Sequence, residues 1–229
     1  MLVRRRAPAA PPPADGAPWR LVIFDFDGTL SDSGDWFLSI ADDLADRFSF
    51  RKVHGDEIEM LRGKTTREVI RYLGIPGWKL PRIARFVQAE FGRNTARIAL
   101  FPGITRMLAD LEAAGVRIAL CTSNNEANAR AILGPENVAR IETFECGASL
   151  FGKAGKFKRV LRRLHVAPGH AIAIGDETRD ITAARKVGMA CGAVLWGYAN
   201  RAVLEAHAPD TLFESPDAIT RRLTAASSG

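Results

Sequence analysis

The residues that decide the fold are Leu21-Val22-Ile23-Phe24-Asp25-Phe26-Asp27-Gly28-Thr29-Leu30. A short apolar run comes first and polar residues with a glycine follow it, which predicts a buried strand running into a turn. Side chains two positions apart on an extended segment point the same way, so we expect Asp25 and Asp27 to converge. Two close carboxylates repel each other unless a cation lies between them or they share a proton. This favours a divalent metal with oxygen ligands, above all magnesium.

Further short apolar runs, each followed by polar or glycine residues, occupy 116–121, 171–175 and 189–195. Between them, apolar residues recur at helical spacing, as at 104–111 and 157–164. Strands that alternate with helices predict parallel βαβ units, and therefore an α/β fold with a doubly wound parallel sheet.

The segment between about 36 and 100 breaks this alternation, because it shows helical patterns and no convincing strand. It follows the first strand almost at once, so we expect it over the carboxyl edge of the sheet, where open α/β folds bind ligands. The predicted parts are a disordered Ala/Pro-rich tail at 1–18, an α/β core domain made of 19–36 and 100–229, and a helical cap domain at 37–99.

Length and composition describe an ordinary folded protein. The chain has 229 residues, of which 47% are hydrophobic and 25% charged, and this excludes disorder over the whole length and collagen-like repeats. No apolar run approaches the ~20 residues of a membrane span, and none follows Arg4 to Arg6 to form a signal peptide. Three cysteines without a close pair fit neither a disulfide framework nor a zinc site. We therefore expect a cytoplasmic protein.

Two further polar turns follow predicted strands. Gly175-Asp176-Glu177-Thr178-Arg179-Asp180 brings more carboxylates to the same edge of the sheet. Thr122-Ser123-Asn124 opens a helix, where hydroxyls and backbone N–H groups are able to hold phosphate oxygens. Alone, an Asp-x-Asp pair is typical of a turn and Thr-Ser-Asn of a helix N-cap. Together, the three turns favour a metal and phosphate site.

This constellation resembles the haloacid dehalogenase superfamily, in the phosphatase-like branch that carries a helical cap and includes phosphoglycolate phosphatase-like members. Asp25-Phe26-Asp27-Gly28-Thr29 matches its first motif, Asp-x-Asp-Gly-Thr, without departure. Thr122 matches the hydroxyl residue of the second motif, and Gly175, Asp176 and Asp180 match the fourth, Gly-Asp-x-x-x-Asp. The resemblance runs from about residue 20 to near residue 223.

The third motif of the family is a lysine near the start of the helix before the fourth motif. The chain offers Lys153, Lys156 and Lys158. We prefer Lys153, which stands just before the helix whose apolar face begins at Phe157. The Lys-Pro pair of phosphoglycolate phosphatase-like members is absent, which leaves Lys156 as an alternative.

The resemblance implies a magnesium-dependent phosphatase that hydrolyses a small phosphomonoester through an aspartyl-phosphate. Asp25 is the expected nucleophile and a metal ligand. Asp27 is the expected general acid and base, with its backbone carbonyl on the metal. Asp176 is the third expected protein ligand of Mg²⁺.

The remaining roles concern the phosphate oxygens. Lys153 and Thr122 are expected to act in catalysis and to bind the substrate together with Ser123 and the N–H groups near Gly28. Asp180 is expected to support them by orienting Lys153 or a metal-bound water. The implied partner is a small phosphorylated metabolite. We expect no nucleic-acid or membrane partner, although the net charge of +6 could attract either. We make no prediction of the oligomeric state.

In the cap, Arg62-Gly63-Lys64-Thr65-Thr66-Arg67 resembles the segment in which related enzymes carry a Gly followed by an Arg that reaches the active site. Arg67 is therefore predicted to bind a second anionic group of the substrate. A solvated helix start is the alternative reading. By default, Trp196 and Tyr198 pack, and Trp36 and Trp78 belong to the cap core. Glu177 could orient Lys153 or a metal-bound water as Asp180 does, but the helix dipole alone favours an acidic residue in a first turn.

Two rival functions share this sequence evidence. A phosphotransferase or mutase of the same superfamily shares every core residue. A non-catalytic interaction protein with the same fold need not keep the nucleophile, the acid, the hydroxyl, the lysine and the metal aspartate together, and all five are present. Dehalogenase activity is disfavoured because that branch lacks an aspartate at the position of Asp27.

Overall fold

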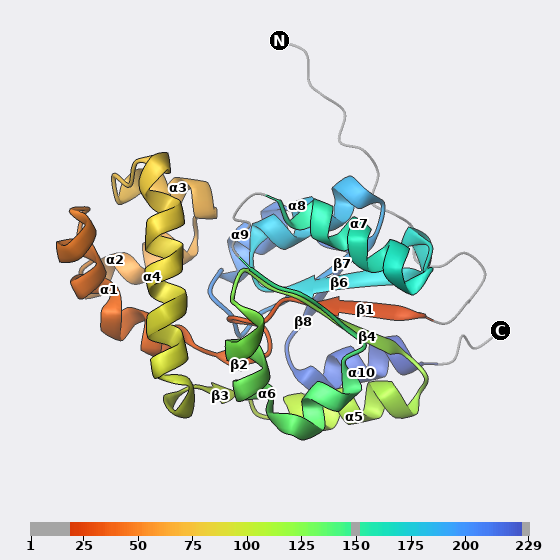
Figure 1. Ribbon diagram of the computed structural model, residues 1–229. Helices are drawn as coiled ribbons and strands as arrows, with labels where there is room; N and C mark the ends of the chain where they lie inside the picture. The colour runs from red at the N-terminus through yellow and green to blue at the C-terminus, as the bar shows by residue number, and fades with distance from the viewer. Residues whose placement is uncertain (1–18, 148–151, 226–229) are drawn as a thin grey trace, which may run out of the picture.

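The computed structural model describes residues 19–147 and 152–225, and the tail expected at 1–18 lies outside them. A parallel sheet with helices on both faces forms its centre (Figure 1). Across the sheet the order is β5 (Thr143–Glu145), β4 (Arg117–Cys121), β1 (Leu21–Phe24), β6 (Ala171–Gly175), β7 (Ala190–Val194) and β8 (Thr211–Phe213). All neighbouring pairs in this sheet are parallel, so the predicted doubly wound α/β fold is confirmed.

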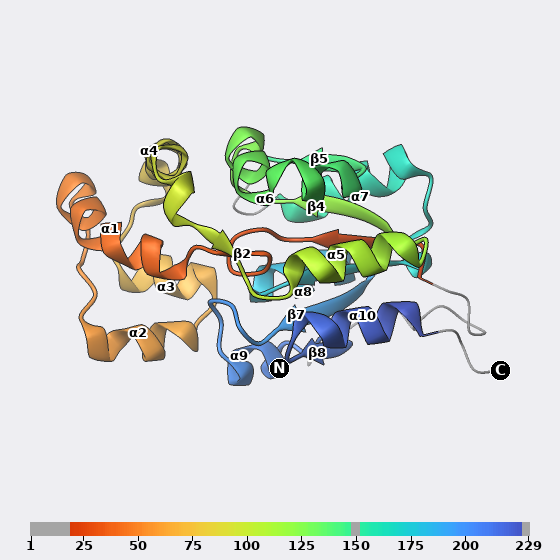
Figure 2. The same ribbon diagram turned by 90° about the horizontal axis from the view of Figure 1, so that it is seen from below.

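Side chains along the strands point alternately into two apolar layers, one on each face of the sheet. Val22 and Phe24 of β1 face one layer, and Leu21 and Ile23 face the other. Such a central parallel strand is buried on both faces, which explains why its sequence is apolar without interruption. On the first layer lie α5 (Ile104–Ala113), α6 (Glu126–Arg140) and α10 (Pro216–Thr224), and on the second lie α7 (Lys153–Leu164), α8 (Thr178–Val187) and α9 (Arg201–Ala206) (Figures 1 and 2).

Four short strands have no counterpart in the sequence prediction. β5 and β8 are edge strands of three residues, too short for an apolar pattern to form. β2 (Ser31–Asp32) and β3 (Ala99–Leu100) pair antiparallel as a two-stranded ribbon. The expectation of no strand between residues 36 and 100 was therefore wrong at β3, where the pairing with β2 rather than the local pattern makes the strand.

The helical segment leaves the core at this ribbon and returns through it. It contains α1 (Gly34–Phe48), α2 (Gly55–Arg62), α3 (Thr66–Tyr72) and α4 (Leu80–Arg93), with 3-10 turns at Gly77–Lys79 and Thr95–Arg97. Figure 1 shows these helices to one side of the sheet, beyond the carboxyl ends of the strands. The segment therefore lies where a cap over a site at that edge is expected.

Packing within the helical segment centres on α1 and α4. The rings of Trp36 and Phe91 meet edge to face at 4.8 Å between centroids, and those of Phe48 and Phe86 at 5.7 Å. α2 and α3 bury no residue fully. Trp78 is 76% exposed, so its expected place in the cap core was wrong. Among the described residues, no helix has the length and apolar character that a membrane span requires.

Candidate active site

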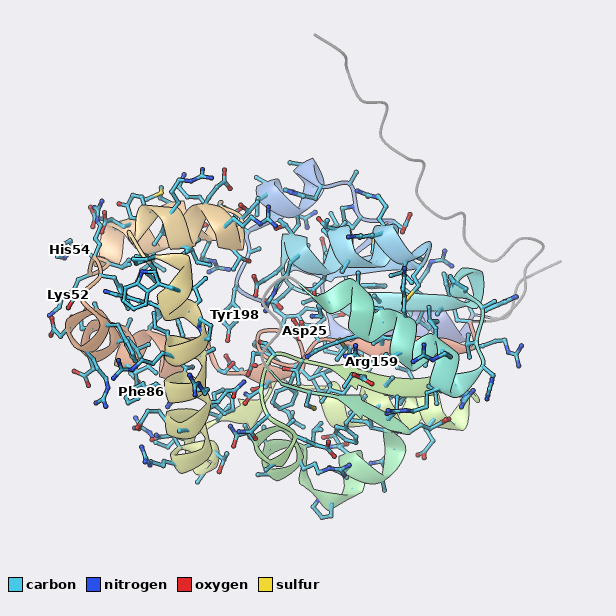
Figure 3. All side chains as sticks on the ribbon, turned by 45° about the horizontal axis from the view of Figure 1, so that its top comes forward. Asp25, Lys52, His54, Phe86, Arg159 and Tyr198 are labelled. Carbon is cyan, nitrogen blue, oxygen red and sulfur yellow. The ribbon has the colours of Figure 1, made fainter. Side chains whose placement is uncertain are left out.

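Three neighbouring strands end at one place. β1 lies between β4 and β6, and Asp25, Thr122 and Asp176 each follow the last residue of one of these strands. Carboxyl ends of parallel strands share one edge of the sheet, so side chains from distant parts of the sequence meet there. Figure 3 shows Asp25 at this edge, with Tyr198 on the side of the helical segment.

The turn after β1 fixes the first carboxylate. The backbone N–H of Asp25 donates to the carbonyl of Ile174 at 2.9 Å, and the N–H of Phe26 donates to Asp25 Oδ1 at 2.8 Å. Gly28 has φ of +77°, and a Cβ there would lie 2.3 Å from Asp176 Oδ2. Glycine is thus required twice, for its left-handed backbone and for the close approach of Asp176.

Asp25, Asp176 and Asp180 form a buried cluster, in which one carboxylate oxygen from each lies within 4.8 Å of the other two. Asp176 is held by two donors, the Thr29 hydroxyl at 2.9 Å and the Tyr198 backbone N–H at 2.8 Å. These donors orient the Asp176 carboxylate but leave its charge without a cationic partner among the described residues.

The lysine that enters this cluster is Lys153. Its Nζ lies 2.7 Å from Asp25 Oδ2 and also contacts Asp180 Oδ1. Lys156, one helical turn on, instead donates to the backbone carbonyls of Thr122 at 2.6 Å and Gly147 at 2.7 Å. The alternative lysine is therefore placed to hold two loops, and not to face the carboxylates.

Burial and neighbouring charges move the pKa values of these carboxylates in opposite directions. Burial would raise the pKa of Asp25, but the charges of Lys153 and Arg179 outweigh it and the pKa is lowered. Burial, with the charges of Glu177 and Asp25, holds the pKa of Asp176 well above its ordinary value. Asp25 is thus the member of the cluster best suited to stay ionised.

Asp27 is not part of this cluster and has polar partners of its own, although the charge of Asp25 still acts on it. Asn124 Nδ2 donates to both carboxylate oxygens at 3.3 Å, and the Ser33 hydroxyl donates to Oδ1 at 3.4 Å. Ser33 also bonds to the Tyr198 hydroxyl at 2.6 Å. Burial and the charge of Asp25 raise the pKa of Asp27 to about 7. At neutral pH this side chain is therefore poised to give and take a proton.

The turn after β4 is ordered by its own side chains. The Thr122 hydroxyl is buried and accepts the N–H of Asn124 at 2.9 Å. The carbonyl of Ser123 accepts the Gln88 amide of α4 at 2.6 Å, which ties this turn to the helical segment. Thr122 and Ser123 thus follow β4 at the sheet edge, next to the end of β1, and their role in phosphate binding stays a prediction.

Two further contacts join the helical segment to the core. The Thr66 hydroxyl donates to Glu177 Oε2 at 2.6 Å, and Arg62 Nη2 donates to the carbonyl of Gly197 at 3.1 Å. Arg67, which the sequence predicted at the site, is exposed. Its neighbour Thr66 is the residue of α3 whose hydroxyl binds Glu177.

Three residues with contacts in this site were given no role in it by the sequence analysis. Arg179 Nη2 lies 3.9 Å from Asp25 Oδ2 and 2.7 Å from Glu177 Oε1. Tyr198 contributes a backbone N–H to Asp176, and Thr29 contributes its hydroxyl. Arg179 had one available signal, a cation in the first turn of a helix, where the dipole disfavours it. The backbone contact of Tyr198 leaves no sequence signal.

These features define an α/β protein with a carboxylate site at the carboxyl edge of its parallel sheet and a helical segment above that edge. A family model described as haloacid dehalogenase-like hydrolase matches residues 22–194. The chain belongs to this family, and its relatives identify it as a phosphatase.

Two curated relatives and one solved structure illustrate the similarity. A phosphoglycolate phosphatase of Synechococcus elongatus is 31% identical over 204 residues, which cover 89% of this chain and 96% of that protein. The tyrosine-protein kinase PtkA of Mycobacterium tuberculosis is 32% identical over 183 residues, which cover 78% of this chain but only 63% of that protein. The structure of a predicted phosphatase from Clostridium acetobutylicum, 18% identical, superposes with a TM-score of 0.77 over 90% of this chain and 99% of that one. This last likeness shows the fold alone.

Proposed function

We propose that this protein is a magnesium-dependent phosphatase that hydrolyses a small phosphomonoester through an aspartyl-phosphate on Asp25. The observation that carries the proposal is the state of Asp25, a buried carboxylate at the end of β1 whose pKa is lowered by Lys153 and Arg179. An ionised carboxylate with its surroundings already ordered is the form that attacks phosphorus.

The residues present fit a magnesium ion. Asp25, Asp176 and Asp180 each place one buried carboxylate oxygen within 4.8 Å of the other two, and Lys153 is the cation that contacts Asp25 and Asp180. The donor set is made of oxygens only, which suits Mg²⁺ better than softer metals. Asp25, Asp176 and the backbone carbonyl of Asp27 would hold the ion. When bound, it would polarise a phosphoryl oxygen and offset negative charge.

Each carboxylate of the first motif has its own step. Asp25 attacks phosphorus in line with the leaving oxygen, and the Asp25–phosphorus bond forms as the ester bond breaks. Asp27 protonates the leaving oxygen and then takes a proton from the water that hydrolyses the intermediate. A pKa of about 7 allows both transfers near neutral pH.

The phosphate oxygens need donors around Asp25. We assign Lys153, the hydroxyl of Thr122 and the N–H groups at Ser123 and near Gly28 to this role, because β4 ends beside β1 and Lys153 contacts Asp25; the N–H of Gly28 itself donates to the Ser31 carbonyl at 2.9 Å. Donors fixed before the reaction stabilise charge that develops in the transition state. Asp180 supports them by binding Lys153.

Residues 37–99 would act as a cap domain over a core made of 19–36 and 100–229. The contacts of Thr66 and Gln88 with the core hold the helical segment over the sheet edge in this structure. A cap of this kind excludes water during phosphoryl transfer and shapes the substrate pocket.

The substrate is proposed to be a small phosphorylated metabolite, with phosphoglycolate as the first candidate because of the 31% identical relative. A panel of phosphoglycolate, sugar phosphates and nucleoside monophosphates tests this. Arg67 stays a prediction: Arg67→Ala should lower kcat/KM for a substrate with a second anionic group but barely for p-nitrophenyl phosphate. Equal losses on both substrates, or none, would refute a specificity role.

Metal dependence gives the first test of the activity itself. Chelation should abolish phosphate release, added Mg²⁺ should restore it, and Ca²⁺ should inhibit because its larger shell misplaces the nucleophile. Asp25→Asn keeps the shape of the side chain but removes its charge, so turnover should fall by roughly a thousandfold or more. Full activity in excess chelator, or more than a few per cent activity in Asp25→Asn, would refute the proposal.

A phosphotransferase is the second candidate, and the 32% identical relative that is named a kinase favours it. The two functions differ in whether water or another hydroxyl takes the phosphoryl group from Asp25. Inorganic phosphate released should equal substrate consumed if water is the acceptor. A deficit of phosphate that grows with added sugar or tyrosine acceptor would favour transfer.

A further inference from the structure

We propose that Arg179 is a second phosphate-binding cation, which contacts oxygens of the phosphoryl group during its transfer to Asp25. The proposal rests on the proposed function, because it adds a contact to that reaction. Arg179 is the second residue of α8 and follows the Asp176 turn directly.

The position of Arg179 is unfavourable for the fold alone. It lies in the first turn of α8, where the helix dipole disfavours a cation. Its side chain is only 21% exposed, and Nε is buried without a hydrogen-bond partner among the described residues. A buried donor without a partner lowers stability. Such a residue is better explained by a ligand that it is placed to meet.

The guanidinium faces the nucleophile. Nη2 lies 3.9 Å from Asp25 Oδ2, and Lys153 Nζ approaches the same oxygen at 2.7 Å. At 3.9 Å, Arg179 leaves room to approach an incoming group rather than binding Asp25 tightly. A phosphoryl group that bonds to Asp25 brings its own oxygens within reach of Nη2. A planar guanidinium is well suited to bind two such oxygens at once.

The balance of charge points the same way. Among the described residues, the carboxylates of this site are Asp25, Asp27, Asp176, Glu177 and Asp180, and the cations that contact them are Lys153 and Arg179. A phosphate dianion would bind beside these carboxylates, where Lys153 and Arg179 are placed to offset its charge. Removing Arg179 would add one more uncompensated charge where the dianion must bind.

Glu177 links this cation to the helical segment. Its Oε1 binds Arg179 at 2.7 Å, and its Oε2 accepts the Thr66 hydroxyl of α3 at 2.6 Å. With the helical segment in this position, Glu177 is fixed from both sides and holds Arg179 beside Asp25. Thr66 is therefore a positioning residue that acts through Glu177.

The experiment compares Arg179→Gln with Lys186→Gln, which removes an exposed cation from the same helix. With Mg²⁺ present, kcat/KM is measured for p-nitrophenyl phosphate and for the best metabolite of the panel. Binding of orthovanadate, which mimics the transferring group, is measured by thermal shift. Arg179→Gln should lower both kcat/KM values about 100-fold and weaken vanadate binding by a similar factor. Lys186→Gln should stay within twofold of wild type in all three.

Chemical rescue and a double-mutant cycle separate a direct contact from general damage. Added guanidinium ion should restore part of the activity of Arg179→Ala, and Arg179→Lys should keep more activity than Arg179→Gln. Thr66→Val should lower kcat/KM severalfold in the wild type but not in Arg179→Gln, because the two residues act as a unit.

Several results would overturn the inference. These are activity of Arg179→Gln within threefold of wild type, unchanged vanadate binding, or a loss confined to metabolites with a second anionic group. If Arg179→Gln does not fold, unchanged vanadate binding in a folded Arg179→Lys would overturn it as well. Wild-type protein inactive on the whole panel, or an active Asp25→Asn, would refute the proposed function and this contact with it.

Discussion

Replacing Asp27 with Asn should stabilise the metal-free protein, and increasingly so as the pH rises. Burial and the charge of Asp25 raise the pKa of Asp27 from 3.8 to about 7. The folded protein therefore holds a proton that the unfolded chain releases, and the stability of the wild type falls as pH rises between these two values. Asparagine resembles the protonated carboxyl in shape and has no proton to lose.

The size of the effect follows from the shift. About three pKa units at 1.36 kcal/mol each give about 4 kcal/mol at pH 8 and above. Of this, about 3 kcal/mol falls between pH 5 and pH 8. For a chain of this length, 4 kcal/mol corresponds to a difference in Tm of roughly 8 to 16 °C.

Urea unfolding in excess chelator, followed by tryptophan fluorescence from pH 5 to pH 8, measures this difference. Asp32→Asn is the matched control, since Asp32 is an exposed aspartate in the same loop region. We expect the curves of stability against pH for wild type and Asp27→Asn to diverge, while Asp32→Asn follows the wild type. A constant gap at every pH would show that Asp27 does not titrate as its surroundings imply, and would remove the argument for its role as acid and base.

Other outcomes follow from single contacts. Gly197→Ala should abolish phosphate release at saturating substrate and Mg²⁺, because the added Cβ would lie 2.2 Å from Asp176 Cβ; a kcat near that of wild type would contradict this packing. Arg62→Ala removes the hydrogen bond to the Gly197 carbonyl and should lower kcat/KM about tenfold in steady-state kinetics. An unchanged kcat/KM would show that this contact does not contribute to the activity. Lys156→Met leaves the carbonyls of Thr122 and Gly147 without their hydrogen-bond donor and should lower the free energy of unfolding by roughly 2 to 4 kcal/mol. An unchanged urea midpoint would count against the structural role of Lys156.

The sequence predicted those features that depend on regular geometry. Asp25, Thr122 and Asp176 could be brought together in advance because each follows an apolar run, and parallel strands end at a common edge. Helices α5 and α7, on opposite faces of the sheet, were likewise visible in the 3.6-residue spacing of their apolar residues. Edge strands of three residues, such as β5, are made by their neighbours and left no such pattern.

The spacing of residues in the sequence could not show which of two lysines on the same face of a helix contacts the carboxylates. Lys153, Lys156, Phe157 and Val160 recur at i, i+3, i+4 and i+7, so all lie on the buried face of α7. The structure separates the two lysines by their partners, since Lys153 meets carboxylates and Lys156 meets backbone carbonyls. Contacts through the backbone, like that of Tyr198 with Asp176, depend on the path of a loop and carry no residue preference.

The central claim is that Asp25 carries the phosphoryl group during turnover. Protein mixed with substrate and Mg²⁺ is quenched in acid within the first turnover and treated with borohydride, which reduces an aspartyl-phosphate to homoserine. Mass spectrometry of the peptide that contains Asp25 should find homoserine at this position in the wild type, and none without substrate or in Asp25→Asn. Phosphate release at the normal rate with Asp25 unmodified at every quench time, or with the modification on another residue, would contradict the claim.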